Sequence, residues 1–293
     1  MLPRLPLRAL VSTLRRSLGR GGLLLFLALP PLPLPAQERG PASADTQPTG
    51  PPLLPDPGFI EDLPKPAKKW SARLRSDFYS KYVWNGVLYS EGPVWQPSAT
   101  LEIYDVGMTV WANFVLGDEP NRGEFNEVDL TLYYQRDLGK WSLQASLISC
   151  LYLNDDPASR NRGPNSLQGY FQVSRALGPV KLFTDLSVGF LEPSGTILWD
   201  FGVSYRRQLP LKFRMETSLL FAVGDARFNK AYFADVGTQA NLLVYSLAFP
   251  WAPLKGFSFI PSLSFSNLLA PSLRRASPEP TVLWGGLSVV YDI

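Results

Sequence analysis

The sequence contains no histidine and a single cysteine, Cys150. One thiol cannot form a disulfide within the chain, so the monomer is not held together by such bonds. The missing imidazole removes the side chain that titrates nearest to neutral pH and most often acts as a general base. Beyond residue 40, no apolar run reaches the roughly 18 residues that a transmembrane helix needs. These absences argue against a histidine-dependent enzyme and against a helical membrane protein.

The chain is nevertheless rich in apolar residues, which make up 45% of its 293 positions, with 13% aromatic. That fraction is too high for a disordered chain, which could not bury so much apolar surface. The apolar residues are spread over many short segments. This dispersion favours a protein built from strands.

The N-terminus has the features of a secretory signal peptide, predicted to span residues 1–36. Five arginines precede the apolar run Leu23–Leu29, and Pro35-Ala36-Gln37 allows cleavage after Ala36. Cleavage would remove five of the 28 basic residues and leave two more acidic than basic residues. The positive charge of the whole chain is therefore no evidence for nucleic-acid binding. Residues 37–69 contain eight prolines and are predicted to form a periplasmic linker without a core of its own.

From Trp70 onward, apolar and polar residues alternate with period two. In the first segment Trp70, Leu74 and Phe78 share one face, while Arg73 and Asp77 lie on the other. Only a strand sorts side chains in this way, because successive residues point to opposite faces. The pattern predicts twelve strands, each of a length suited to a tilted membrane crossing, at residues 70–84, 94–105, 106–117, 127–137, 141–153, 166–176, 180–190, 196–206, 211–222, 235–249, 256–267 and 281–293.

The connections between these segments alternate between short turns and longer polar loops, as in bacterial outer-membrane barrels. The exceptions are Leu191–Gly195, which is short where a long loop is expected, and residues 250–255, which are long for a turn. We therefore predict that residues 70–293 form an all-β, transmembrane, antiparallel up-and-down β-barrel of about twelve strands of the outer-membrane type. The alternative is a soluble periplasmic β-protein whose apolar faces point inward. Aromatic residues are expected near the membrane interfaces. Those predicted near periplasmic strand ends are Trp70, Trp141, Trp251 and Tyr291, and those near outer ends are Tyr82, Trp84 and Phe190.

The stretch Ser76–Gly86, followed by Gln96-Pro97-Ser98, resembles the first hairpin of a family of conserved bacterial outer-membrane proteins that has no assigned activity. Glu124–Leu130 is also similar to this group. The resemblance implies the same barrel fold and transfers no function. In such proteins an arginine precedes the glycine of the first segment, whereas this chain has Asn85 there, so any role of that arginine does not carry over.

The barrel interior is the surface that bears most on function. The residues that alternate with the apolar ones along each predicted strand face this interior, and they include charged residues of both signs. The provisional lumen-lining set is Arg73, Arg75, Asp77, Lys81, Asp185, Asp200, Arg214 and Glu216. Such a lining predicts a narrow passive channel or transporter for small polar solutes. Alternatively, the charges pair and close the lumen, which would leave a structural or surface-interaction barrel acting through its outer loops.

No motif predicts a catalytic residue, a cofactor site or a metal site. Cys150 falls on the lumen face, where a small apolar filler is expected. The expected partners are outer-membrane lipid and lipopolysaccharide, a small polar solute and the outer-membrane assembly machinery. The last is expected because Thr281–Ile293 alternates to its final residue, which resembles the C-terminal strand signal of such barrels. The predicted location is the outer membrane, after export through a cleaved signal peptide.

Overall fold

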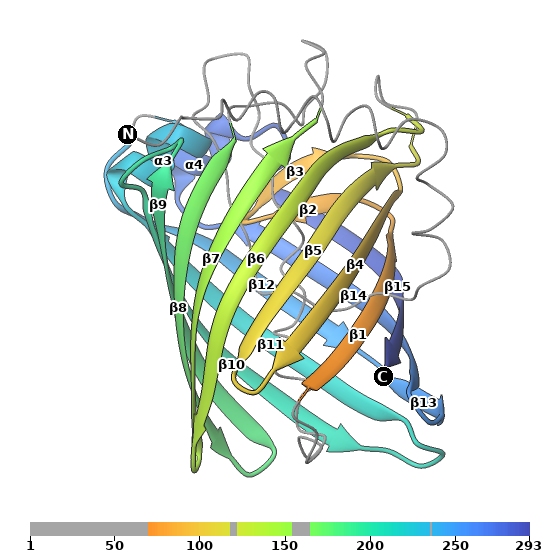
Figure 1. Ribbon diagram of the computed structural model, residues 1–293. Coiled ribbons are helices and arrows are strands. Elements are labelled where there is room, and N and C mark those ends of the chain that lie inside the picture. The colour runs from red at the N-terminus through yellow and green to blue at the C-terminus, as the bar shows by residue number, and fades with distance from the viewer. Residues whose placement is uncertain (1–69, 118–121, 154–164, 235) are drawn as a thin grey trace, which may run out of the picture.

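A computed structural model describes residues 70–117, 122–153, 165–234 and 236–293, and its strands close into a barrel (Figure 1). The predicted signal peptide and linker lie outside these residues. In the described part, twelve strands form the ring, each antiparallel to its neighbours. The β1–β15 and β12–β14 pairings join the ends of the sheet, so the ring has no free edge. The predicted twelve-stranded barrel is therefore confirmed.

The barrel strands are β1 (Trp70–Tyr79), β4 (Val94–Ile103), β5 (Val106–Val115), β6 (Phe125–Leu138), β7 (Trp141–Tyr152), β8 (Ser166–Leu177), β9 (Val180–Leu191), β10 (Ile197–Gln208), β11 (Arg214–Gly224), β12 (Gln239–Ala248), β14 (Phe257–Leu268) and β15 (Thr281–Asp292). Three further elements lie between them near one end of the ring: a hairpin of β2 (Tyr82–Trp84) and β3 (Val87–Ser90), and two helices, α3 (Ala226–Tyr232) and α4 (Pro271–Ala276). A short strand, β13 (Trp251–Leu254), pairs with the start of β14.

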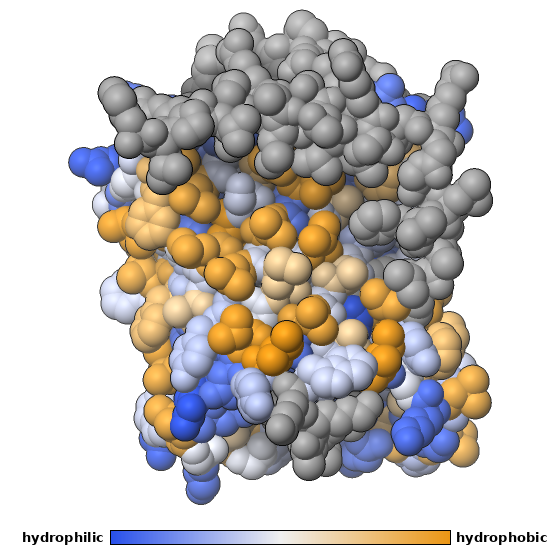
Figure 2. Space-filling view, in the orientation of Figure 1, coloured by the Kyte–Doolittle hydropathy of each residue, from blue (hydrophilic) through white to orange (hydrophobic). Residues whose placement is uncertain are grey.

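Period two sorts the side chains into an apolar exterior and a polar interior. Leu132 and Phe171 point outward and are 52% and 50% exposed, whereas Thr131 and Gln168, next to them in sequence or on the same strand, are fully buried. Figure 2 shows hydrophobic residues across the middle of the outer surface. The alternative of a soluble protein with inward apolar faces is therefore wrong. No helix in the described part of the chain is long and apolar enough to span a bilayer.

The two ends of the barrel differ. Tyr104-Asp105, Gly139-Lys140, Gly178-Pro179 and the 209–213 link connect successive strands at one end, the short-turn end. β1 begins and β15 ends there too, since Trp70 pairs with Ile103, which precedes the first of these turns. The opposite end, the hairpin end, carries β2–β3, α3 and α4 (Figure 1). Most connections at the hairpin end are longer than those at the short-turn end, as predicted. The exception is residues 192–196 between β9 and β10, which the sequence also predicted to be short.

One prediction about the first strand is wrong. The strand predicted over 70–84 ends at Tyr79, and the chain then turns inward as the β2–β3 hairpin. Asn85 and Gly86 form its tip with φ angles of 42° and 80°, the pair of positive values that a tight type I′ turn requires. Tyr82 and Trp84 are therefore not interface aromatics: both are fully buried inside the barrel. Their rings are shielded from solvent by packing inside the barrel and do not contact lipid.

Glycines on the inner face make room for aromatic rings. Gly202 is the cross-strand partner of Phe183, whose ring lies where a side chain of residue 202 would begin. The same relation joins Gly107 of β5 to Tyr133 of β6, a third of the way around the ring. A ring laid over a glycine fills the inner face without forcing the two strands apart, and it fixes their register.

We expect Gly202→Ala to destabilise the barrel by about 1–3 kcal/mol, because the new methyl group and the Phe183 ring compete for the same space. The free energy of unfolding in urea, measured in lipid bilayers, provides the test. Gly237→Ala is the control, since no atom lies near the position of its new methyl group. Equal stability of the two variants would show that the contact does not constrain the sheet.

Candidate functional site

The inner wall between the two ends is lined with hydrogen-bonded polar side chains. On neighbouring strands β4, β5 and β6, the Gln96 amide donates to Asn113 over 2.9 Å, and the Asn113 amide donates to Asn126 over 2.8 Å. Four residues further toward the short-turn end on β4 and β5, the hydroxyls of Thr100 and Thr109 lie 2.6 Å apart. All five side chains are buried, so this part of the lumen is polar although it is shielded from bulk water.

A charged network lies on β1 and β15. Arg75 Nε donates to Asp77 Oδ1 over 2.6 Å, and Arg75 Nη2 donates to Ser288 Oγ over 2.8 Å. The Tyr79 hydroxyl is 3.4 Å from the same Nη2. Only 4% of either charged side chain is exposed. A buried ion pair is tolerated only when each partner is neutralised and hydrogen-bonded, as it is here.

A second charged group lies on β10 and β11. Glu216 Oε1 is 3.5 Å from Arg206 Nε, its cross-strand partner, and 3.6 Å from Arg214 Nε on its own strand. Glu216 is buried, whereas the two arginine side chains are 21% and 17% exposed. Two guanidinium groups facing one carboxylate give this group of three side chains a net positive charge.

The other provisional lumen residues occupy different levels of the barrel. Arg73 pairs with Asp292 near the short-turn end. Lys81 follows the end of β1, and its Nζ lies 3.6 Å from Oε2 of Glu279 at the hairpin end. Asp185 and Asp200 are cross-strand partners on β9 and β10, which places two acidic residues side by side. The ion pairs Arg73–Asp292, Arg75–Asp77 and Arg206–Glu216 thus join residues on the same strand or on neighbouring strands of the wall.

A buried acidic group lies on β6 and β7. The carboxylates of Glu127 and Asp129 and the thiol of Cys150 lie within 4.8 Å of one another, and Asp129 and Cys150 are cross-strand partners. Cys150 is fully buried and packs with Ile148 and Tyr170. This group gives the β6 side of the lumen a negative character, in contrast to the group of Arg206, Arg214 and Glu216.

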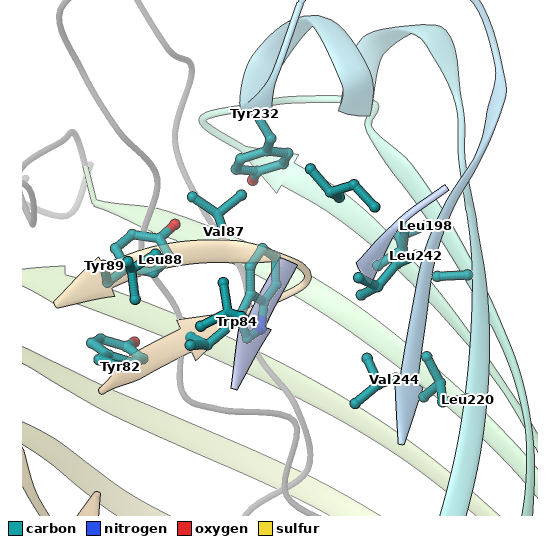
Figure 3. Close-up of a cluster of buried hydrophobic side chains, with 14 of the residues drawn as sticks. Tyr82, Trp84, Val87, Leu88, Tyr89, Leu198, Leu220, Tyr232, Leu242 and Val244 are labelled. Carbon is teal, nitrogen blue, oxygen red and sulfur yellow. The ribbon is translucent and has the colours of Figure 1, made fainter. Parts of the chain in front are cut away.

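The β2–β3 hairpin crosses the hairpin end of the lumen (Figure 3). On one side, the Tyr82 hydroxyl donates to Glu127 of β6 over 2.9 Å, and its ring is 6.1 Å from that of Trp111 of β5. On the other side, the Trp84 ring lies 5.8 Å from Tyr232 of α3, which connects β11 to β12. Because β5–β6 and β11–β12 are half a turn apart in the twelve-strand ring, the hairpin spans the barrel.

The hairpin is held there by an apolar cluster. Its tip, Gly86, fits against Leu242 of β12 and Leu268 of β14 so closely that a methyl group would overlap both. The cluster also contains Phe228 of α3 and Leu273 of α4, both fully buried. Burial of this apolar surface stabilises the inward position of the hairpin. The lumen is therefore polar along most of its wall and apolar where the hairpin crosses it.

The sequence-based site set did not contain the hairpin residues or the amide chain of Gln96, Asn113 and Asn126. Asn85-Gly86 between two apolar triplets is a strong hairpin signal that could have revealed β2–β3. The amide chain has no such signal, since Asn126 lies in a different hairpin from Gln96 and only the barrel register brings them together.

No protein-family model matches the sequence, and no curated protein matches it. Several solved outer-membrane barrels have a similar arrangement. The NanC porin is 9% identical over 75% of this chain and 97% of its own, with a TM-score of 0.43. The KdgM porin, in complex with disordered oligogalacturonate, is 8% identical over 75% and 98%, with a TM-score of 0.45. An outer membrane channel from Pseudomonas putida F1 is 12% identical over 76% and 95%, also with a TM-score of 0.45.

These likenesses concern the fold alone. The resemblance of the first hairpin to a conserved outer-membrane family stays a prediction. The function of this chain is therefore inferred from its own residues.

We expect Asp77→Asn to cost about 3–5 kcal/mol of stability, because it leaves the buried Arg75 guanidinium without its carboxylate partner. The double variant Arg75→Gln/Asp77→Asn should recover much of that loss, since no buried charge then remains at this position. Urea unfolding of the wild type, both single variants and the double variant measures the coupling. If the double variant lost as much unfolding free energy as the two single variants together, the two residues would not be energetically coupled.

Proposed function

We propose that this protein is a narrow passive channel of the outer membrane for small polar solutes, with the β2–β3 hairpin restricting its outer mouth. The observation that carries the proposal is the polar inner wall, which runs from the Arg73–Asp292 pair at the short-turn end to Tyr82 and Glu127 beneath the hairpin. An interior needed only for packing would be stabilised more by apolar side chains than by charges, whose burial is costly.

The arrangement of charge supports weak selectivity. At the level of Glu216, the β10–β11 wall carries two arginines around one carboxylate, whereas the β6 wall carries Glu127 and Asp129. These two walls are separated by three other strands on the shorter path around the ring. Opposed charges of this kind produce a transverse field, and they orient polar solutes without binding them tightly. Provisional pathway residues are Arg73, Arg206, Arg214 and Glu216.

The second candidate function is a closed surface-interaction barrel. It is favoured by the apolar cluster around Trp84, in which Phe228, Tyr232 and Leu273 are buried at the hairpin end. In that case the lumen would conduct nothing, and the connections at the hairpin end would bind a partner. Both candidates place the short turns in the periplasm and the hairpin end outside, after export through the predicted signal peptide. Neither assigns the protein a catalytic role.

Arg206→Gln should shift the reversal potential of the channel toward greater cation permeability, because it removes one positive charge from the lumen wall. Arg207→Gln is a matched control: it removes the same charge one residue further along β10, where the side chain is exposed on the outer face. Reversal potentials in planar bilayers under a salt gradient make the comparison. Equal shifts in both variants would remove Arg206 from the pathway.

Replacement of residues 82–90 by a short Gly-Ser linker should raise the single-channel conductance several-fold, since the hairpin crosses the lumen. Trp84→Ala is the smaller change, which should loosen the cluster and increase the frequency of open events. Heat-dependent gel mobility checks that each variant is folded. A folded protein that conducts neither with nor without the hairpin would favour the closed barrel.

A further inference from the structure

The membrane-facing surface of the barrel carries an apolar groove of about 560 Å³ across β6 to β9. Its floor lies at Ala145 and Gly169, and its walls include Leu132, Phe171 and Phe190. These walls are outward-facing and half-exposed. The groove is thus separate from the lumen, although the backbone between them is shared.

Small outward residues create the groove. Ala145 and Phe171 are cross-strand partners, and Gly169 pairs with Leu147 on the next outward rung. With no side chain at position 169, the Phe190 ring folds over that glycine from β9. Large apolar side chains therefore surround a low strip at Ala145, which the flat Phe190 ring borders at Gly169. Such a depression in a membrane-facing wall is filled by hydrocarbon, because water is absent at that depth.

A basic and aromatic group lies on the same strands, nearer the short-turn end. The Arg175 guanidinium stacks over the Trp141 ring at 5.0 Å from its centroid, and these residues are cross-strand partners on β8 and β7. Lys140 is exposed in the adjoining turn. Within the described part of the chain, no carboxylate lies in ion-pair range of Arg175. Its in-plane N–H groups can donate to an anion while the ring holds the guanidinium in place.

The spacing of the two features fits a lipid. Arg175 is four residues from Phe171 along β8, which corresponds to about 13 Å of strand. That length lies within the roughly 15 Å of one hydrocarbon leaflet. A phosphate at Arg175 and Lys140 would therefore be joined to a hydrocarbon chain lying in the groove at Ala145 and Gly169.

We propose that this surface is a phospholipid-binding site, with the acyl chain in the groove and the phosphate at Arg175 and Lys140. The chemistry favours a phospholipid of the periplasmic leaflet, because the basic group lies at the short-turn end. A second copy of the chain would fill the groove with side chains but would leave the isolated guanidinium without an anion. The site depends on the transmembrane barrel and is independent of whether the lumen conducts.

The test uses the full chain, purified and placed in phosphatidylcholine nanodiscs that contain a minor fraction of phosphatidylglycerol with a photoreactive group in its acyl chain. Adducts mapped by mass spectrometry should concentrate on the groove strands around residues 145 and 169. Arg175→Gln should lower this labelling about five-fold, as expected for the loss of one interfacial cation. Ala145→Leu should lower it comparably by filling the groove.

Matched controls are Arg207→Gln, an exposed arginine at the same end of β10, and Ala99→Leu, an outward alanine on β4 outside the groove. Both should label as the wild type does. Heat-dependent gel mobility confirms that all variants are folded. The proposal would be overturned by adducts spread evenly around the barrel or by equal labelling of Arg175→Gln and Arg207→Gln. It would also be overturned if the groove were labelled in the monomer and protected in a dimer, because a second copy of the chain would then be its occupant.

Discussion

Every backbone N–H and C=O group inside a bilayer must find a hydrogen-bond partner within the protein, because lipid offers none. The rest of this structure depends on that constraint. The β1–β15 and β12–β14 pairings satisfy it by closing the sheet on itself. Once the ring is closed, each side chain has only two environments, the lipid and the lumen, and parity decides between them. Leu132 and Thr131 are adjacent in sequence, yet one is half-exposed to the membrane side and the other is fully buried inside.

Inside the barrel, the buried polar side chains need hydrogen-bond or ion-pair partners within the protein. Residues on the same strand or on neighbouring strands provide these partners. Arg75 is bonded to Asp77 and Ser288, and Glu216 lies beside two arginines of its own hairpin. Pairs of this kind consume no space across the bore, which keeps the wall compatible with solute passage. At the outer end the same lumen changes to an apolar cluster, where Trp84 and Leu273 are buried around the hairpin. The barrel therefore combines a polar conduit with an apolar constriction.

Inner and outer surfaces of the same strands serve separate purposes. On β7 and β8, Ser146 and Gln168 face inward, whereas Ala145 and Gly169 face the lipid and form the floor of the groove. Glycine has different consequences on the two faces. Inside, Gly202 accommodates an aromatic ring and fixes the register of two strands. Outside, Gly169 lets the Phe190 ring lie flat beside Ala145, which leaves a groove that hydrocarbon can occupy. A single alternating sequence thus specifies a lumen and a membrane-facing site at once.

The sequence by itself determined the class of fold and the two faces of the barrel strands, because period two and strand length are local properties of the chain. Arg75 and Asp200 could be assigned to the interior on that basis, and Leu132 to the exterior. The sequence placed Tyr82 and Trp84 on the wrong face, because the first strand ends at Tyr79. Even Asn85-Gly86 carried a local hairpin signal. The tertiary structure alone decided where that hairpin goes, because its inward position depends on contacts with β6 and α3 that are distant in sequence. It also decided which charges pair, since strand register brings Arg73 to Asp292 from the two ends of the barrel domain.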